Sequence, residues 1–225
     1  MPLLHSVQVL PPGRVSAGTG LSGQVVLKNL PSATGTDQAA NETETQIQNN
    51  TIAPAVAPWV SARVGITGSN EAGLAYNGRA IRLDGRHSFA LNKKNSLALS
   101  AGLGGELLLL GRPRSGNQEP QSLLGGGFDI PLLFGWRSTA GLYSAWIGPR
   151  PGLSFVRGTL ADGTAFSAQD GRLGFVAGLS VGFRQVHVAM ELGGAFHFVD
   201  ALVASKRVEF NQFALTPAGA LVLTF

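Results

Sequence analysis

The chain has no cysteine and few charged residues among its 225. Without cysteine it cannot form a disulfide framework, a thiolate metal site or a cysteine nucleophile. Charged residues make up 13% of the chain, about half the usual share, whereas disordered chains are rich in charge. No apolar run approaches the roughly 18 residues of a transmembrane helix, yet the mean hydropathy is +0.16. Few architectures combine an apolar composition with the lack of a helical span.

A strong cluster of basic residues is also missing. The net charge is +4, but the arginines and lysines are scattered, and no cluster exceeds Lys93-Lys94. Nucleic-acid binding requires a concentrated basic patch. We therefore expect no nucleic-acid partner.

What the chain does have is alternation with a period of two residues, which is the signature of β-strands. The clearest case is residues 185–199, where one face carries Val186, Val188, Met190, Leu192, Phe196 and Phe198. The opposite face is polar or small. The same pattern predicts ten strands, at residues 14–28, 56–67, 71–77, 81–91, 96–110, 124–137, 142–157, 171–184, 185–199 and 209–225.

The number of strands depends on Asn77-Gly78. The parity of the apolar positions changes there, from Leu74 and Tyr76 to Ile81 and Leu83. Asn-Gly favours a type I′ turn, although a bulge in one long strand would also change the parity. We favour the turn and ten strands, with eight strands as the alternative. Short connections otherwise alternate with longer polar ones at 29–55, 111–123, 158–170 and 200–208, and residues 29–55 form a long polar loop.

Bulky residues on one strand face and glycine, alanine and serine on the other predict an inside-out barrel. Large apolar groups then contact lipid, while small and polar groups fill the interior. The sheet must close, because open edges cannot be satisfied in hydrocarbon. Aromatic residues near the short turns fit an interfacial girdle (Phe89, Trp136, Tyr143, Phe183 and Phe225). A soluble barrel is the alternative, but its exterior would need more charge. The predicted fold class is all-β: a transmembrane antiparallel up-and-down barrel.

The last residues carry a resemblance to a known class. Alternating apolar positions end in a C-terminal aromatic residue (Gly219, Leu221, Leu223 and Phe225). With the alternation throughout the chain, this end resembles the assembly signal of bacterial outer-membrane β-barrel proteins. The resemblance implies an integral protein of the Gram-negative outer membrane, in contact with lipid and lipopolysaccharide. It also implies recognition by the outer-membrane assembly machinery, and does not identify a subfamily.

The resemblance also orients the chain. Phe225 and the N-terminus would both lie at the periplasmic rim. Residues 1–12 would be a periplasmic lead-in and residues 13–225 a single barrel domain, with 29–55 as an extracellular loop. The first residues lack the charged and apolar regions of a secretory signal, so we expect that the leader has been removed.

No catalytic or cofactor constellation stands out. Residues 18–23 match G-x-G-x-x-G, but the motif lies within an alternating strand rather than before a helix. His87 and Ser88 are adjacent and face opposite ways, so they cannot readily form a nucleophile–base pair. We therefore expect no cofactor and no enzymatic activity.

Two further histidine arrangements predict neither a catalytic site nor a metal site. His197, Asp200 and Glu209 lie near the long-loop rim, without a second acidic pair. His187 and Glu191 share a face but are about 13 Å apart along the strand. A two-residue site of that kind does not support a metal, and we expect none.

The charged residues on the inward face are the candidate functional set. They are Arg14, Lys28, Arg63, Arg82, Asp84, Arg86, Glu106, Asp129, Arg137, Arg150, Arg172, Arg184, His187, Glu191 and His197. Buried charges need partners, so one interpretation is a salt-bridged interior that closes the barrel. The other is a narrow, porin-like pore whose excess of guanidinium groups favours anions. Two other functions stay open: a surface adhesion or interaction protein whose barrel anchors its loops, and a lipid-modifying enzyme.

Overall fold

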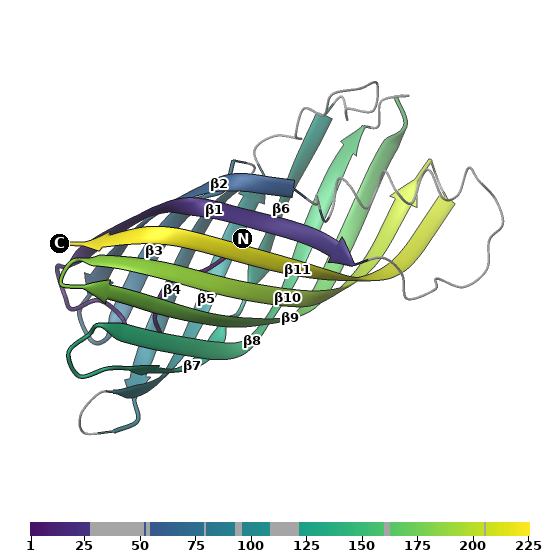
Figure 1. The fold of residues 1–225 in the computed structure, drawn as a ribbon. Helices are drawn as coiled ribbons and strands as arrows, with labels where there is room; N and C mark the ends of the chain where they lie inside the picture. Colours follow the sequence, from purple (N-terminus) through teal and green to yellow (C-terminus); the bar gives the residue numbers. More distant parts are fainter. Residues whose placement is uncertain are drawn as a thin grey trace.

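The computed structural model describes residues 1–27, 52, 55–78, 80–92, 96–108, 122–159, 163–204 and 206–225. These residues form a closed antiparallel β-barrel of ten strands, which confirms the predicted fold class (Figure 1). Its elements are β1 (Val15–Leu27), β2 (Ala55–Ile66), β3 (Asn70–Tyr76), β4 (Ala80–Ala90), β5 (Leu97–Leu108), β6 (Ser122–Asp129), β7 (Leu132–Arg137), β8 (Tyr143–Thr159), β9 (Ala165–Phe183), β10 (Val186–Val203) and β11 (Lys206–Thr224). No helix in these residues could span a membrane.

Each strand pairs with its neighbours in the sequence, and the first pairs with the last. β1 and β11 are antiparallel, with Ser16 opposite Thr224. This pairing removes the open edges that a sheet cannot leave in hydrocarbon. The C-terminal rim is the end of the barrel where β11 ends, β1 begins and the β9–β10 turn lies (Figure 1).

Eleven elements make ten strands of the wall because β6 and β7 are two pieces of one strand. β6 and β7 both pair with β5 on one side and β8 on the other, and Ile130 and Pro131 separate them. Proline has no N–H to donate to the ladder, so it interrupts the strand. The Pro131 carbonyl still accepts a bond from Gly102 N at 3.0 Å. The predicted strand 124–137 is therefore one wall segment with a break.

The turn at Asn77-Gly78 is confirmed. β3 and β4 are a hairpin with Tyr76 opposite Ile81, and Gly78 has φ +76°, which favours glycine. Asn77 Oδ1 accepts a bond from Ala80 N at 3.0 Å. Because β3 has 7 residues and β9 has 19, the wall of the barrel is much lower at this hairpin.

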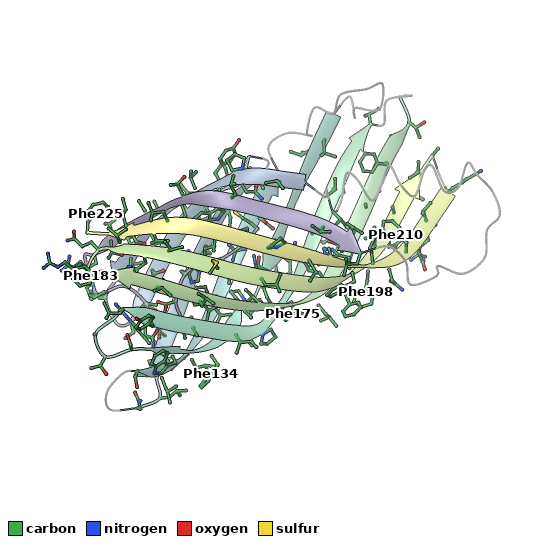
Figure 2. The ribbon with its side chains drawn as sticks, viewed as in Figure 1. Phe134, Phe175, Phe183, Phe198, Phe210 and Phe225 are labelled. Carbon is green, nitrogen blue, oxygen red and sulfur yellow. The ribbon has the colours of Figure 1, made fainter. Side chains whose placement is uncertain are left out.

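The exterior of the wall is apolar, as predicted. On β10 the outward residues from Val186 to Phe198 are apolar, and Asp200 is the first outward charge. At a strand tilt of about 40° these thirteen residues rise roughly 30 Å, enough for the lipid-facing band of an outer-membrane barrel. Phe183 and Phe225 are exposed at the C-terminal rim, where the aromatic girdle is expected (Figure 2).

Five strands, β6 and β8 to β11, continue beyond the lipid-facing band. We call residues 122–125, 156–159, 165–169, 199–203 and 206–210 the extension; Figure 1 shows it projecting past the shorter strands. Here the pattern is reversed, because the interior is apolar. Val156, Phe166, Val199, Val203 and Phe210 form one buried cluster. The outward side carries exposed charges, including an Arg207–Asp200 ion pair at 2.8 Å.

The extension corrects one feature of the predicted topology. Residues 158–170 and 200–208 are predicted to be long connections, but most of them are strand. The apolar pattern changes face between the two regions: apolar residues point outward in the lipid-facing band and inward in the extension. A strand predicted from one apolar face therefore stops at the boundary between these regions, although the strand itself continues.

Candidate functional site in the barrel interior

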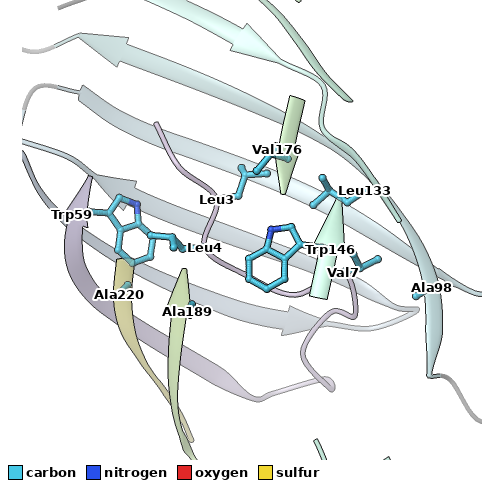
Figure 3. Packing of buried hydrophobic residues seen from close by; sticks show 10 residues of the cluster. All are labelled: Leu3, Leu4, Val7, Trp59, Ala98, Leu133, Trp146, Val176, Ala189 and Ala220. Carbon is cyan, nitrogen blue, oxygen red and sulfur yellow. The ribbon is translucent and has the colours of Figure 1, made fainter. Parts of the chain in front are cut away.

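The N-terminal segment occupies the barrel interior. The sequence predicts a periplasmic lead-in at residues 1–12 that is separate from the barrel domain, whereas the structure buries Leu3, Leu4 and Val7 to 3% exposure or less. They pack against the inward indoles of Trp59 and Trp146 (Figure 3). Their apolar side chains explain the difference, because burial inside the barrel removes them from water. The segment then leaves the interior near Gly65, whose N–H donates to Arg14 O at 2.9 Å.

Buried carboxylates hold the backbone of this segment. Leu3 N and Leu4 N donate to the two oxygens of Glu191 at 2.7 and 2.8 Å. Leu10 N donates to Glu71 Oε2 at 2.8 Å. Hydrogen bonds to a charged acceptor are short and strong, so the irregular segment has partners for these donors without joining the sheet.

Arginines hold the carbonyls of the same segment. Arg150 Nη1 donates to Met1 O at 2.5 Å, and Arg86 Nη1 donates to Ser6 O. Trp146 Nε1 reaches Glu191 Oε2 at 3.2 Å. Donors and acceptors on four strands therefore fix the segment across the interior.

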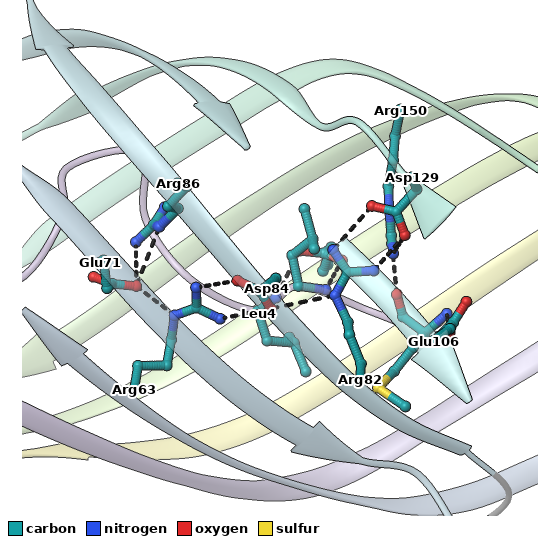
Figure 4. A network of polar contacts seen from close by, with 12 residues as sticks. Leu4, Arg63, Glu71, Arg82, Asp84, Arg86, Glu106, Asp129 and Arg150 are labelled. Carbon is teal, nitrogen blue, oxygen red and sulfur yellow. Dashed lines mark hydrogen bonds and ion pairs between the residues drawn. The ribbon is translucent and has the colours of Figure 1, made fainter. Parts of the chain in front are cut away.

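The first ion-pair cluster joins β2, β3 and β4. Arg63 pairs with Glu71 and, at 2.5 Å, with Asp84. Arg86 Nη2 lies 2.9 Å from Glu71 Oε1. All four side chains are at most 8% exposed (Figure 4). Each buried charge thus has an opposite partner, as burial demands.

The second cluster centres on Asp129 at the end of β6. Arg82 pairs with Asp129 and, at 3.3 Å, with Asp84, which links the two clusters (Figure 4). Arg150 Nη2 lies 2.8 Å from Asp129 Oδ2. Arg172 lies 3.6 Å from the same oxygen and 3.2 Å from Glu106. Asp129 is completely buried and therefore depends on these cations.

Two glycines make room for the clusters. A Cβ at Gly73 would collide with the Arg63 guanidinium, and a Cβ at Gly104 would collide with that of Arg82. The planar guanidinium groups lie against the backbone of the neighbouring strand at these positions. The glycine-rich inward face is thus what allows long arginine side chains to pair inside a narrow barrel.

The inward charges of the wall are nearly balanced. Among the described residues, five arginines and six carboxylates are buried or half-buried inside: Arg63, Arg82, Arg86, Arg150, Arg172, Glu71, Asp84, Glu106, Asp129, Asp170 and Glu191. Glu71 and Asp170 are absent from the candidate set. Glu71 begins a short predicted strand, and Asp170 falls in a predicted connection. The interior of the described wall therefore has no excess of guanidinium groups.

The remaining candidates lie elsewhere. Arg14, Arg137 and Arg184 are exposed at the C-terminal rim, and Arg184 is in the β9–β10 turn with φ +56°. His187 is half-buried beside them, with Nε2 3.1 Å from Gly141 O. Lys28 and most of the loop at 29–55 lie outside the described residues.

His197 forms the one interior histidine–carboxylate contact of the described barrel wall. Its Nδ1 lies 2.9 Å from Asp170 Oδ2, and both side chains are buried. Ser154 Oγ donates to the same Asp170 oxygen at 3.4 Å. A serine hydrolase instead needs the histidine between serine and carboxylate. The order here, with the carboxylate in the middle, does not activate Ser154 as a nucleophile.

The described residues contain neither a metal-binding cluster nor a glycine-rich motif placed for a nucleotide. Within the described ranges, no three histidine or acidic side chains come close enough to hold a metal ion. The G-x-G-x-x-G match at residues 18–23 lies within β1, paired to β2 and β11, where it cannot open a helix.

The chain is similar to solved outer-membrane barrels. The attachment invasion locus protein Ail of Yersinia pestis is 10% identical, with 96% of this chain and 100% of that chain covered and a TM-score of 0.44. Neisserial surface protein A is 10% identical, with coverages of 94% and 96% and a TM-score of 0.41. The monoaromatic hydrocarbon channel CymD is 8% identical, with coverages of 97% and 90% and a TM-score of 0.28. No protein-family model and no curated protein sequence matches the chain.

The geometry defines the class of protein. A closed barrel with ten strands, an apolar exterior band and charged residues inside is the architecture of an outer-membrane β-barrel.

Proposed function

We propose that this protein is an outer-membrane anchor whose lumen is closed by its own N-terminal segment, and whose extension presents a surface outside the cell. The observation that carries the proposal is the segment itself. Leu3, Leu4 and Val7 are buried inside the barrel, and both Leu3 N and Leu4 N are bonded to Glu191. An interior filled in this way favours the structural interpretation over an open pore.

The same proposal places the protein in the bacterial outer membrane with the C-terminal rim in the periplasm. The lipid-facing band supports contact with lipid and lipopolysaccharide, and Phe225, exposed at the rim, supports recognition by the assembly machinery. The reversed pattern of the extension supports a position in water. Its outward side is charged, at Arg207 and Asp200, and its core is apolar like that of a soluble domain. The order of Ser154, Asp170 and His197 supports a role without catalysis.

Planar-bilayer recording tests the closed lumen. We expect the full-length protein to give no steady conductance, and a variant lacking residues 2–10 to conduct continuously. Heat-dependent mobility on a denaturing gel checks that the variant still forms a barrel. Equal, steady channels from both proteins would contradict the proposal.

A gated narrow pore is the second candidate, because cavities lie on both sides of the segment. One, of about 100 Å³, is lined by Met1 and Pro2 together with extension-side residues such as Val156. The other, of about 570 Å³, lies at the C-terminal rim and is lined by Leu4 to Ser6 and Gln8 to Pro11 of the segment. Displacing the segment would join them. Brief openings of the full-length protein that become permanent in the variant lacking residues 2–10 would favour this candidate over the anchor.

A further inference from the structure

We propose that the cavity at the C-terminal rim binds a phosphate-bearing anion. We call this cavity the rim chamber. It measures about 570 Å³ and is lined by five arginines, namely Arg14, Arg63, Arg86, Arg137 and Arg184. Its volume lies within the range of small-ligand sites, roughly 300–1,000 Å³.

The rim chamber has more arginines than carboxylates. Among the described residues its one lining carboxylate is Glu71, which already accepts bonds from Arg63, Arg86 and Leu10 N. The other three arginines have no carboxylate partner among the described residues. Arg184 instead lies over the ring of Phe183, 5.1 Å from its centroid. Three guanidinium groups from separate strand ends therefore line the chamber without an ion-pair partner among the described residues.

The polar lining supplies further donors. Hydroxyl groups of six serine and threonine residues border the chamber, among them Ser144, Ser180 and Thr224 from three strands. His187 donates from Nε2 to Gly141 O, and the Arg137 guanidinium lies beside the same glycine. The Gly141 loop thus holds the imidazole and the guanidinium side by side at the chamber wall.

His5 presents a buried, unpaired nitrogen to the chamber: its Nδ1 has no hydrogen-bond partner among the described residues. A buried polar atom of this kind normally has a partner. An oxygen of a bound anion in the chamber would accept a bond from this nitrogen when it carries the proton.

Phosphate is the chemistry that suits these donors. The guanidinium fork matches two oxygens of a phosphate, and hydroxyl groups can donate to the remaining ones. A polyvalent phosphate could contact arginines from different strand ends at once. Two sources share this chemistry: a free phosphate compound in the aqueous phase, and the headgroup of an anionic lipid at the rim.

Calorimetric titration of pyrophosphate into the purified full-length barrel in zwitterionic detergent tests the site. We expect one pyrophosphate per barrel. The double variant Arg137→Gln/Arg184→Gln should bind at least about tenfold more weakly, since each lost charge-assisted bond weakens binding. Arg207→Gln is the matched control, because Arg207 is an exposed arginine at the opposite end. It should leave the affinity unchanged. Heat-dependent gel mobility confirms that each variant is folded.

The outcomes separate the site from general charge effects and the two sources from each other. No binding by the full-length protein, or an equal loss in Arg207→Gln, would overturn the proposal. If a lipid headgroup occupies the chamber, pyrophosphate should bind more weakly in nanodiscs of phosphatidylglycerol than in nanodiscs of phosphatidylcholine. Equal affinity in both nanodiscs would assign the site to a free anion. Neither result depends on whether the barrel conducts.

Discussion

At the scale of single residues, Asp129 forms ion pairs with arginines from three different strands. It is completely buried and pairs with Arg82 from β4, Arg150 from β8 and Arg172 from β9. Arg150 in turn bonds to Met1 O. The wall on both sides of the β6–β7 break and the N-terminal segment are therefore connected through this carboxylate.

Asp129→Asn tests that role. The amide keeps the shape but removes the charge, leaving three cations with one fewer partner, and breaking a buried pair costs about 3–5 kcal/mol. We expect a markedly lower urea midpoint for unfolding from lipid vesicles. Asp200→Asn is the control, because its ion pair with Arg207 is exposed and should contribute little. A variant as stable as the parent protein would show that the Asp129 cluster is not structural.

Alternation could assign a residue to a face of a strand but not to a partner. It distinguishes positions such as Arg82 and Leu83, because successive side chains point to opposite faces. It could not show that Arg63 contacts Asp84 or that Arg82 contacts Asp129, since each of these pairs joins residues of different strands. At Arg184 it does not apply, because a residue in a turn belongs to neither face.

At the scale of elements, the side chains of β10 change in polarity at the expected edge of the membrane. Its outward residues are apolar from Val186 to Phe198 and polar at Asp200, while its inward residues change from Glu191 and His197 to Val199 and Val203. The two changes occur within a few residues of each other. The strand thus passes from a lipid-facing wall into a wall that faces water.

Two leucines on the outward face of β10 test this boundary. Leu192 and Leu202 are similarly exposed, at 46% and 51%. We expect Leu192→Arg to destabilise the barrel in vesicles by about 2–4 kcal/mol and Leu202→Arg by at most about 1 kcal/mol, because the cost of arginine depends on depth. Equal losses in the two urea titrations would place the boundary elsewhere.

The N-terminal segment shows why part of the site could not be predicted. It has no strand periodicity, and its donors are bonded to Glu191 and Glu71, which are far away in the sequence. Only the folded barrel brings these carboxylates to Leu3 and Leu10. The ten strands, by contrast, follow from local alternation and from turn residues such as Asn77-Gly78, where periodicity alone leaves a turn and a bulge both possible.

At the scale of the whole molecule, the barrel has a charged core in one region and an apolar core in the other. In the lipid-facing band the core is the ion-pair network, and in the extension it is the apolar cluster around Phe166 and Phe210. The N-terminal segment fills the first of these with its own apolar residues, including Val7. The lumen of a ten-strand barrel is thus filled at the level of the segment, although the lining of the wall is polar and rich in glycine.

The most direct measurement is thiol labelling of single cysteines, which is unambiguous because the chain has no other cysteine. Val7 is 1% exposed inside the barrel, and Pro12 is exposed at the C-terminal rim. In the folded protein, we expect a water-soluble maleimide to label Pro12→Cys rapidly and Val7→Cys hardly at all, with both labelled in denaturant. Equal, rapid labelling of both in the folded barrel would contradict a lumen closed by the N-terminal segment.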